Sequence, residues 1–583
     1  MDSTLDGKLK KWLEWDQDPE TLAEIKNLTD SGQFDQLRNL LCSRLTFGTA
    51  GIRGRMGAGF NQMNDLVIIQ TSQGLAKYLL KIDPLVKNAG VVIGFDGRYH
   101  SRSFAERTAV AFISQDIPVY LFSQIVPTPF IPFAIRTLKC SAGVMVTASH
   151  NPKEDNGYKV YFSNGAQIIS PHDKGIQESI LCNLEPWKDA WKHDKLGSVI
   201  NKLSDIEKQY YDTLKNRIIS SASIASTDLK FVYTAMHGVG YKYAMNILKV
   251  CGFTRVFPTE AQVQPDPEFP TVKFPNPEEE GALDLAIETA RQHQAQIVFA
   301  NDPDADRLAI AERQPNGSYK VFTGNETGIL LGHWLWMVHT QKDPNRPAGD
   351  CYMLSSAVST QFLSTLAMKE GFNFVQTLTG FKWMGNEADD LIRKGKKVLY
   401  AFEEALGHMC GTHILDKDGL TAMVEAGQMA AHLYSKGLTL QQQLDNLYTR
   451  YGRSVTMNSY FICHDSQKIE KTFANIANWK GSGTYPQNLG PFKIVRVRDL
   501  QRCFDSSTSD KRPTLPCSSS SFMITFYFEN NVVLTIRTSG TEPKVKYYSE
   551  IISKPGESEQ EASNKLEIVI NYMKTELLGD IAS

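Results

Sequence analysis

Several absences limit the class of protein. The nine cysteines include no CxxC pair, and an odd, scattered set in a chain of 583 residues predicts reduced thiols and no disulfide framework. The longest apolar run, GILLGHWLWMV, has about half the length that a bilayer requires. The stretch MDSTLDGKLKKWLEWD lacks the apolar core of a signal peptide. We therefore expect a cytoplasmic protein with no membrane partner.

The chain also lacks a strong net charge. The formal net charge is −2, with 42% hydrophobic and 22% charged residues, as in an ordinary globular protein. No global field therefore favours nucleic acid, and any anionic ligand must be bound by local charge. The length predicts about three to five domains.

Strands and helices alternate from about residue 65. Residues 4–45 have the spacing of surface helices, residues 91–96 and 119–122 are predicted strands, and 103–115 is a predicted helix between them. This alternation indicates α/β units. From residue 446 the pattern changes. A hairpin around 529–531 and a Ser-rich stretch at 505–520, which we interpret as a flexible loop, indicate a smaller α+β domain.

Three apolar strands end in polar clusters. Residues 143–146 lead into TASHNP, 296–300 into NDPDADR and 396–402 into EEALG. Ligands of open α/β sheets bind beyond the carboxyl ends of the strands. We therefore predict three similar domains facing one cleft, although no repeat is visible in the residues themselves.

The stretch NDPDADR carries the first candidate site. Asp302, Asp304 and Asp306 repel one another unless a cation lies among them, and Mg²⁺ prefers such oxygen ligands. Arg307 beside them could hold a phosphate group. The alternative is a solvated acidic turn.

The stretch RTSGTEPK carries a second candidate site. Arg537, Ser539, Gly540, Thr541 and Lys544 could form a phosphate cradle from backbone N–H groups, hydroxyls and cations. The spacing is not that of a Walker loop, and a plain hairpin loop is the alternative. FGTAGIRG lacks the GxGxxG spacing, and HGVG is weaker still, because a lone histidine such as His237 is more often structural.

Ser149 in TASHNP is the candidate nucleophile. Acyl transfer would require a GxSxG elbow, which is absent. A serine that accepts a phosphoryl group needs cations around its oxygen and a metal to neutralise charge. Arg53, Lys159 and the three aspartates would supply these if the first two domains face each other.

The four motifs TASHNP, DPDADR, EEALG and RTSGTEPK, in this order, resemble the α-D-phosphohexomutase superfamily over roughly residues 40–560. The resemblance implies an α/β protein of four domains around one cleft: three related mixed α/β sheet domains and a C-terminal α+β domain like the TATA-binding protein. We place the domains at 1–215, 216–322, 323–445 and 446–583.

The resemblance also implies residue roles. Ser149 matches the phosphoryl carrier and, with Asp302, Asp304 and Asp306, a Mg²⁺ ligand. Lys417 in LDKDGL matches a lysine suspected of acid/base work. The other catalytic matches are Arg53, His150 and Lys159, and the substrate-binding matches are Thr49, Arg307, Thr379, Gly380, Glu403, Ala405, His408, Arg537, Ser539, Gly540 and Thr541.

The implied reaction is an intramolecular phosphoryl transfer catalysed by an isomerase. Phosphoserine 149 would convert a sugar 1-phosphate into the 5- or 6-phosphate through a bisphosphate intermediate. Mg²⁺ would be the cofactor, glucose 1,6-bisphosphate the activator and small sugar phosphates the only partners of a monomer.

The sugar loop departs from the hexose pattern E-x-S, because Ala405 stands where the serine is expected. EEALG resembles the phosphopentomutase branch, which acts on ribose 1-phosphate and deoxyribose 1-phosphate and keeps some glucose-phosphate activity. A glucose phosphomutase is the second interpretation and a glucose-1,6-bisphosphate synthase the third. Alternatively, Ala405 is drift without consequence.

Two hypotheses come from other classes. A metal-dependent sugar-phosphate hydrolase of the alkaline-phosphatase type would need histidine ligands, and none lies near the three aspartates in the sequence. A non-catalytic sugar-phosphate sensor would be expected to have lost Ser149 or one of the aspartates.

Overall fold

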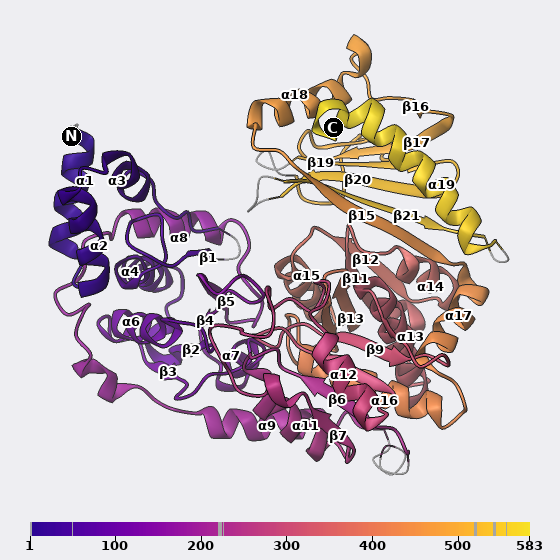
Figure 1. Cartoon of the computed structure of the whole chain (residues 1–583), viewed down its shortest axis with the longest axis horizontal. Helices are drawn as coiled ribbons and strands as arrows, with labels where there is room; N and C mark the ends of the chain where they lie inside the picture. Colours follow the sequence, from indigo (N-terminus) through magenta and orange to yellow (C-terminus); the bar gives the residue numbers. More distant parts are fainter. Residues whose placement is uncertain are drawn as a thin grey trace. The chain divides into compact units, whose positions relative to one another are not determined.

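The computed structural model describes residues 3–48, 51–219, 224, 227–517, 522–539, 544–554 and 557–582. Two compact units make up the chain (Figure 1). Unit 1 comprises Met1–Pro344 and Gly380–Thr439, and unit 2 comprises Asn345–Thr379 and Leu440–Ser583. Each unit is described by itself.

The predicted N-terminal helical region forms three helices: α1 (Ser3–Trp15), α2 (Pro19–Asp30) and α3 (Phe34–Leu41). The break before α2 follows from its cap, because Asp18 accepts the Glu20 N–H at 2.8 Å and Pro19 is the first helical residue. Trp12 and Leu37 pack with Phe60 in one buried cluster. The helices thus attach to the first α/β layer, as predicted.

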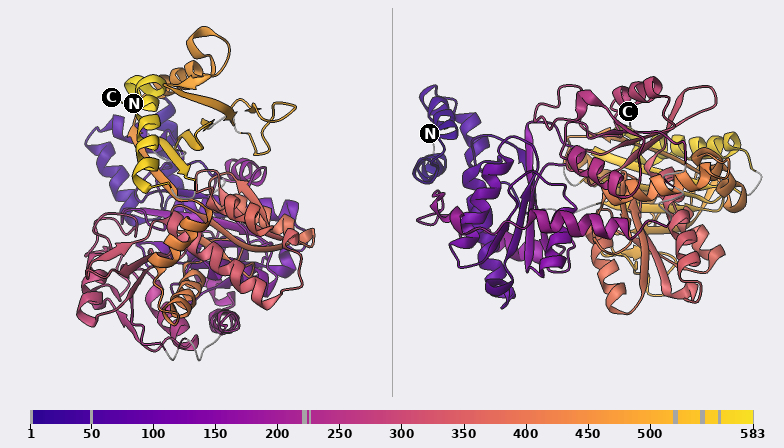
Figure 2. Two further views of the ribbon diagram at one scale, coloured as in Figure 1. Left: turned by 90° about the vertical axis from the view of Figure 1, so that its right-hand side faces the viewer. Right: turned by 90° about the horizontal axis from the view of Figure 1, so that it is seen from below.

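The first sheet contains β1 (Ile52–Arg55), β2 (Val91–Phe95), β3 (Val119–Leu121), β4 (Ala142–Val146) and β5 (Asp155–Phe162) in the order β1-β5-β4-β2-β3. β2 runs parallel to β3 and β4, whereas β5 is antiparallel to β4. All residues of β2 and β4 are buried, because helices cover both faces (Figure 2). These helices are α4 (Asp65–Ile82), α6 (Ser101–Ile113), α7 (Phe130–Leu138) and α8 (His172–Leu181).

Two glycines allow one of these helices to approach the sheet. A Cβ on Gly94 would lie 2.7 Å from Ile131 Cδ1, and a Cβ on Gly143 would lie 2.8 Å from Ile131 Cγ2. Helix α7 therefore packs directly on the backbone of β2 and β4. The segment between the first two sheets contains α9 (Leu203–Lys215).

The second sheet repeats this topology. It contains β6 (Phe231–Thr234), β7 (Val256–Pro258), β8 (Ile297–Ala300), β9 (Ala309–Arg313) and β10 (Tyr319–Val321) in the order β10-β9-β8-β6-β7. β6 is parallel to β7 and β8, and β9 is antiparallel to β8. The main helices are α11 (Gly240–Val250) and α12 (Asp284–His293). The first four strands of this sheet therefore correspond, in chain order, to β2–β5.

The third repeat has the same strand pairs. In unit 1, β13 (Lys397–Glu403) is antiparallel to β14 (Gly407–Cys410), with helices α13 (Gly324–Lys342), α15 (Phe381–Arg393) and α16 (Gly419–Tyr434). In unit 2, β11 (Cys351–Ser356) is parallel to β12 (Asn373–Thr377), and α14 (Phe362–Glu370) lies between them in the chain. The prediction of three related mixed α/β layers is confirmed.

The C-terminal part is an antiparallel sheet. β15 (Ser454–Ile462), β16 (Asn488–Leu489), β17 (Phe492–Asp499), β19 (Met523–Phe528), β20 (Val532–Thr538) and β21 (Lys544–Ile552) have the order β15-β21-β20-β19-β17-β16. The hairpin predicted around 529–531 joins β19 to β20. Helix α19 (Glu559–Tyr572) buries Leu566 and Val569 against the sheet. Helices α17 (Leu440–Tyr451) and α18 (Ser466–Ala477) complete this part.

Two predictions about this region need correction. Cys503 and Cys517 form a disulfide, although the sequence predicts reduced thiols. The first residue of the Ser-rich stretch, Asp505, belongs to a strand and not to a loop. β18 (Phe504–Asp505) pairs with β17, and Arg496 donates to Asp505 Oδ2 at 2.6 Å. This turn brings the two cysteine Cα atoms to 5.4 Å, which spacing along the chain cannot reveal.

The apolar run GILLGHWLWMV lies within α13, where most of its residues are buried. Among the described residues, no helix is long and apolar enough to cross a membrane.

Candidate functional site

Three loops follow equivalent strands of the three repeats. Ser149 comes after β4, Asp302, Asp304 and Asp306 after β8, and Glu403 ends β13. Each strand is the third of four corresponding strands in chain order: β4 of β2–β5, β8 of β6–β9 and β13 of β11–β14. Contacts among these loops, all within unit 1, build the candidate site.

Ser149 lies where the first two repeats meet. Its Oγ donates a hydrogen bond to Asp302 Oδ2 at 2.9 Å and lies 3.2 Å from His150 Nδ1. The backbone of Ser149 is left-handed, with φ of 54°, and its N–H donates to Thr147 Oγ1 at 2.9 Å. Burial and the charges of Arg307 and Arg53 lower the pKa of His150 well below its usual range. A neutral imidazole therefore faces the serine hydroxyl.

The three aspartates are fully buried, and each offers a carboxylate oxygen within 4.8 Å of the others. Lys159 Nζ lies 2.7 Å from Asp304 Oδ2 and 3.0 Å from Asp306 Oδ2, and Lys417 Nζ lies 3.1 Å from Asp306 Oδ2. These lysines come from β5 and from the segment after β14. All three repeats therefore contribute to one cluster of buried charges.

The residues present fit a divalent cation. Asp304 Oδ1 and Asp306 Oδ1 are buried and accept no hydrogen bond from the part of the chain that the structure describes. A buried carboxylate oxygen without a partner is costly unless a cation binds it. Hard oxygen ligands without histidine or cysteine suit Mg²⁺. The acidic group could therefore bind a metal.

The neighbouring charges are mutually stabilised. Burial alone would lower the pKa of Lys159, but Asp304 and Asp306 raise it above its ordinary value. Burial would likewise raise the pKa of Asp304, but Lys159 and the Thr128 hydroxyl, 2.6 Å away, lower it well below its usual range. Lys159 and Asp304 are thus held in their charged forms.

Arg307 connects the metal loop to the sugar loop. Its N–H donates to Asp302 Oδ1 at 3.1 Å, and its backbone forms a β-bridge with Gly407. Its carbonyl accepts from Asn301 Nδ2 at 2.6 Å, and a Cβ on Gly419 would lie 2.3 Å from that carbonyl. The backbone of Arg307 is therefore closely packed, and its guanidinium lies between Glu278 at 3.5 Å and Asp302 at 3.9 Å.

The predicted sugar loop lies beside Lys417. A Cβ on Gly407 would lie 2.4 Å from Lys417 Cδ. The absence of a side chain at Gly407 therefore allows the Lys417 side chain to pack directly on the backbone of the loop. Glu403 accepts a hydrogen bond from the Gly380 N–H. Burial and the nearby Glu404 raise the pKa of Glu403 to about 7. Ala405 is half-buried in the same loop.

Some predicted site residues are not brought into this cluster. His408 is fully buried, and its Nδ1 lies 2.8 Å from Tyr400 Oη, with its ring stacked on Tyr400 and Phe402. It faces the sheet interior because it pairs with Phe402 across β13 and β14. Arg53 lies at the edge of the site: its side chain is exposed and donates to Asn151 Oδ1 at 3.0 Å, and its charge acts on His150 and on Asp304. The position of His408 gives no support to its predicted contact with substrate.

The predicted phosphate loop belongs to unit 2. Arg537 on β20 donates to Tyr548 Oη at 3.2 Å, and the Ser539 N–H donates to the Lys544 carbonyl at 2.9 Å. Thr379 ends the first segment of this unit. Thr49, Gly540 and Thr541 lie outside the described residues. All these roles remain predictions.

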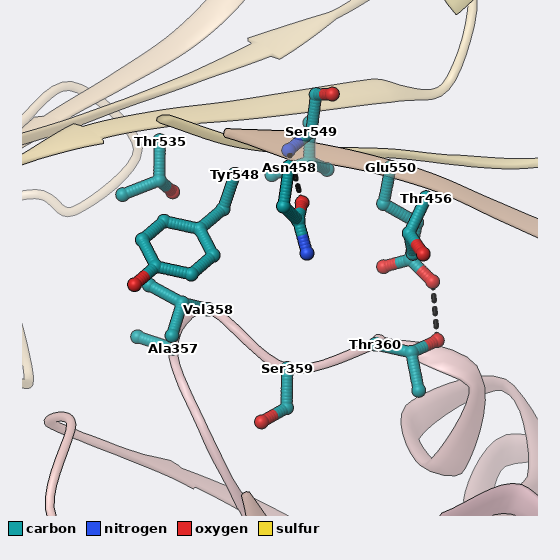
Figure 3. Close-up of a pocket in the computed structure, with 11 residues that line it drawn as sticks. Ala357, Val358, Ser359, Thr360, Thr456, Asn458, Thr535, Tyr548, Ser549 and Glu550 are labelled. Carbon is teal, nitrogen blue, oxygen red and sulfur yellow. Dashed lines mark hydrogen bonds between the residues drawn. The ribbon is translucent and has the colours of Figure 1, made fainter. Parts of the chain in front are cut away.

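Unit 2 also has a small pocket beside these strands. Figure 3 shows Tyr548 and Thr535 above the turn that carries Ala357 and Val358. At its other end, Glu550 accepts hydrogen bonds from Thr360 and from the Gln361 N–H. Tyr548, which accepts the hydrogen bond from Arg537, lines this pocket. None of the predicted site residues is among the described residues that line it.

Two contributors escaped the sequence analysis. Thr128 lies at the start of the segment that leads into α7. Its hydroxyl donates to Asp304 Oδ2, and its N–H donates to the Asp304 carbonyl at 2.9 Å. Asp416, next to Lys417, accepts from Tyr161 Oη at 2.8 Å. Thr128 stands in no motif with a known chemistry. Asp416, although it lies within LDKDGL, was not distinguishable there from a loop acid.

Comparison with known proteins identifies the family. The three phosphoglucomutase/phosphomannomutase α/β/α domain models, I, II and III, match residues 44–185, 208–317 and 323–451. The chain therefore belongs to the phosphoglucomutase/phosphomannomutase family, within the α-D-phosphohexomutase superfamily.

Individual relatives span nearly the whole chain. The chain is 50% identical to human phosphopentomutase over 575 residues, which cover 97% of this chain and 94% of that protein. It is 46% identical to human glucose 1,6-bisphosphate synthase over 569 residues, covering 96% and 92%. The solved structure of pp63/parafusin (phosphoglucomutase) from Paramecium, in its open form, is 20% identical with a TM-score of 0.68, covering 93% of this chain and 96% of that one.

Proposed function

We propose that this protein is a pentose phosphomutase, which interconverts the 1-phosphate and 5-phosphate of ribose and deoxyribose and has secondary activity on glucose 1-phosphate. The observation that carries the proposal is the placement of Ser149 Oγ, 2.9 Å from Asp302 and at the edge of a buried cluster of carboxylates and lysines. The identity to human phosphopentomutase supports the pentose assignment.

The reaction needs two phosphoryl transfers. Phosphoserine 149 gives its phosphoryl group to the free hydroxyl of the sugar phosphate, which loses a proton as its oxygen bonds to phosphorus. The Ser149 Oγ–phosphorus bond breaks, and Ser149 Oγ takes up one proton in place of the phosphoryl group. The bisphosphate then returns its other phosphoryl group to Ser149 Oγ, which loses its proton, while the sugar oxygen that leaves phosphorus gains one. Neutral His150, 3.2 Å from Ser149 Oγ, is placed to exchange the proton of that oxygen.

Lys417 acts in its charged form. Burial alone would lower the pKa of Lys417, but Asp306 and Asp416 raise it above its ordinary value. A lysine with a raised pKa keeps its proton at neutral pH, so it offsets negative charge and does not act as a base. We therefore propose that Lys417 stabilises the transferring phosphoryl group through its positive charge.

Asp302, Asp304 and Asp306, with an oxygen of phosphoserine 149, would hold Mg²⁺. When bound, Mg²⁺ offsets the negative charge that develops during transfer. The need for Mg²⁺ follows from the local balance of charge. Two lysines already pair with two of the aspartates. A phosphoryl group on Ser149 adds up to about two further negative charges, which these lysines do not offset.

Ala405 carries the sugar preference. The hexose pattern places a serine hydroxyl there, and its loss should weaken hexose binding by roughly 1 kcal/mol. A difference of this size changes preference without abolishing activity on either sugar. We further propose glucose 1,6-bisphosphate as the molecule that primes Ser149, and a monomeric, cytoplasmic enzyme.

The first test compares kcat/KM for ribose 1-phosphate and glucose 1-phosphate with Mg²⁺ and a trace of glucose 1,6-bisphosphate. We expect ribose 1-phosphate to be preferred by about tenfold, equivalent to roughly 1.4 kcal/mol. A preference for glucose 1-phosphate would refute the pentose assignment and retain the mutase. Release of inorganic phosphate as the main product would refute the mutase.

The similarity to human glucose 1,6-bisphosphate synthase favours a second candidate. A synthase would accumulate glucose 1,6-bisphosphate from glucose 1-phosphate when a separate phosphoryl donor is supplied. Product analysis by mass spectrometry under these conditions separates the two activities.

A further inference from the structure

A buried arginine supports the backbone of the Ser149 loop. Arg98 follows β2, and only 1% of its side chain is exposed. Its guanidinium donates hydrogen bonds to four backbone carbonyls of the loop. They are those of Ser149 at 2.6 Å, Asn151 at 2.7 Å, Pro152 at 2.8 Å and Asp155 at 3.2 Å.

The charge of Arg98 is balanced locally. Asp96 Oδ2 lies 3.3 Å from Arg98 Nε, and its side chain is also 1% exposed. Asp96 Oδ1 also accepts hydrogen bonds from Ser101 Oγ at 2.6 Å and from the Arg98 N–H at 3.0 Å. This carboxylate offsets part of the guanidinium charge, which also interacts with Asp304 and Asp302. The four carbonyl contacts are a contribution to the geometry of the loop.

The second repeat holds Arg98 from the other side. The Phe269 ring centroid lies 5.1 Å from the Arg98 guanidinium carbon. Glu268 accepts from Tyr99 Oη at 2.7 Å and from Lys153 Nζ at 2.6 Å. Tyr99 follows Arg98 in the chain, and Lys153 lies within the loop itself. Residues 268–269 thus contact both the arginine and the loop that it supports.

The HGVG motif positions this segment. The Asp266 N–H donates to the His237 carbonyl at 3.0 Å, and His237 Nε2 lies 2.8 Å from Thr271 Oγ1. Phe269 itself has a left-handed backbone, with φ of 47°, and is 5% exposed. Such a conformation persists in a non-glycine residue only when its surroundings determine it. The contact with Arg98 is therefore a fixed feature of the fold.

We infer that Arg98 is a positioning residue for phosphoryl transfer, and that Glu268 and Phe269 keep it in place. Arg98 holds the backbone of residues 149–155 so that the left-handed Ser149 directs its Oγ at Asp302. The inference rests on the proposed phosphoserine chemistry, because it assigns Arg98 to that same site. The contacts of Arg98 with the loop are all to backbone carbonyls, and it need not touch substrate.

The central experiment replaces Arg98 with Lys and with Ala in the full-length enzyme. One ammonium group cannot reproduce a planar fork that reaches four carbonyls. We expect kcat to fall about a hundredfold in both variants, as for a misplacement of about 1 Å. We expect KM to stay within about threefold, because ground-state substrate contacts are unchanged.

Two readouts separate positioning from a general loss of structure. Guanidinium ion at millimolar concentration should restore part of kcat to Arg98→Ala but not to Arg98→Lys, whose side chain fills the space. Intact-mass measurement of Ser149 phosphorylation by glucose 1,6-bisphosphate should be slowed about as much as turnover. The matched control is Arg102→Ala on α6, where Arg102 is 72% exposed and its guanidinium pairs with Glu106 at 2.9 Å. We expect it to behave as wild type.

A second pair of variants keeps the inference testable if Arg98 variants do not fold. Glu268 is 47% exposed, so Glu268→Gln should fold normally. Together with Phe269→Leu, it should lower kcat about twofold to fivefold with KM unchanged, the range expected for a partly exposed ion pair. A folded Arg98→Ala with kcat within threefold of wild type would overturn the inference, and so would an unchanged Glu268→Gln/Phe269→Leu enzyme.

Failure of the proposed function gives a different result. A wild-type enzyme that phosphorylates Ser149 but does not isomerise sugar phosphates would refute the mutase. In that case the rate of Ser149 phosphorylation still decides the role of Arg98.

Discussion

The loops after β4 and β8 occupy the same position in two sheets of the same strand order, yet they carry opposite chemistry. The first provides a hydroxyl and an imidazole, Ser149 and His150, with Lys159 on the next strand. The second provides three buried carboxylates, Asp302, Asp304 and Asp306. The shared topology determines where a functional loop can lie, whereas its residues determine what the loop can do.

The difference between the loops has an electrostatic consequence. Three carboxylates buried alone would be unstable, but Lys159 from the first repeat and Lys417 from the third contact them at 2.7 to 3.1 Å. No single repeat holds a complete site. Packing of the repeats is therefore a requirement of the chemistry as well as of the fold.

The largest effect should come from removing the hydroxyl of the first loop. Ser149→Ala should lower mutase turnover by at least about a thousandfold, because the phosphoryl carrier is lost. The overall fold should persist, since only a hydroxyl is removed. The measurement is the rate of ribose 1-phosphate conversion together with a melting curve. Ser198→Ala, at an exposed serine, is the control, and appreciable activity in Ser149→Ala would contradict the phosphoserine mechanism.

The carboxylates of the second loop should be nearly as important. Asp304→Asn should lower kcat by about a hundredfold to a thousandfold, because a metal ligand and the partner of Lys159 are both weakened. A chelator should abolish wild-type activity, and added Mg²⁺ should restore it. Titration calorimetry with Mg²⁺ should show weaker binding in the variant. Asp205→Asn, in an exposed pair with Lys202, should change nothing, and equal Mg²⁺ affinity in Asp304→Asn would exclude this residue as a ligand.

The third loop should alter preference rather than rate. Ala405→Ser restores the hydroxyl of the hexose pattern and should raise the ratio of kcat/KM for glucose 1-phosphate over ribose 1-phosphate by about fivefold to tenfold. Side-by-side kinetics on the two substrates measure this ratio, and Ala405→Gly controls for loop flexibility. An unchanged ratio would mean that Ala405 does not determine the sugar.

The smallest effect should be a change in the pH dependence of stability, and it concerns His408. Unlike His150, which lies in the site, His408 lies inside the sheet. Burial lowers the pKa of His408 to about 3, so the folded protein keeps it neutral. As the pH falls below about 6.5, the unfolded chain binds a proton that the folded chain excludes, and stability decreases. His408→Asn should remove this contribution.

The thermal midpoint of wild type should therefore fall more between pH 7 and pH 5 than that of His408→Asn. Activity of the variant at pH 7 should remain within about threefold of wild type, because His408 contacts Tyr400 and Phe402 rather than the charged cluster. His193→Asn, at a half-exposed histidine, is the control. A large loss of activity in His408→Asn would show that His408 does contribute to the functional site.

Much of the fold was predictable, because the signals are local. The strands at 91–95, 142–146 and 297–300 are uninterrupted apolar runs, and such runs are typical of buried strands. The repeated topology was inferred only from the polar clusters that follow these strands. The disulfide between Cys503 and Cys517 was missed, because it depends on the pairing of β18 with β17.

The sequence by itself determined the α/β class, the family and the residue types that carry the chemistry, because motifs such as TASHNP and DPDADR are contiguous. Only the tertiary structure decided which distant groups meet. It brings Lys159 and Lys417 to the same aspartate, turns His408 into the sheet and places Arg98 under the Ser149 loop. The contacts of Arg98 with Ser149 and of Lys159 with Asp306 join residues that are 51 and 147 positions apart in the chain. They depend on the packing of whole repeats, for which no local pattern in the chain carries a signal.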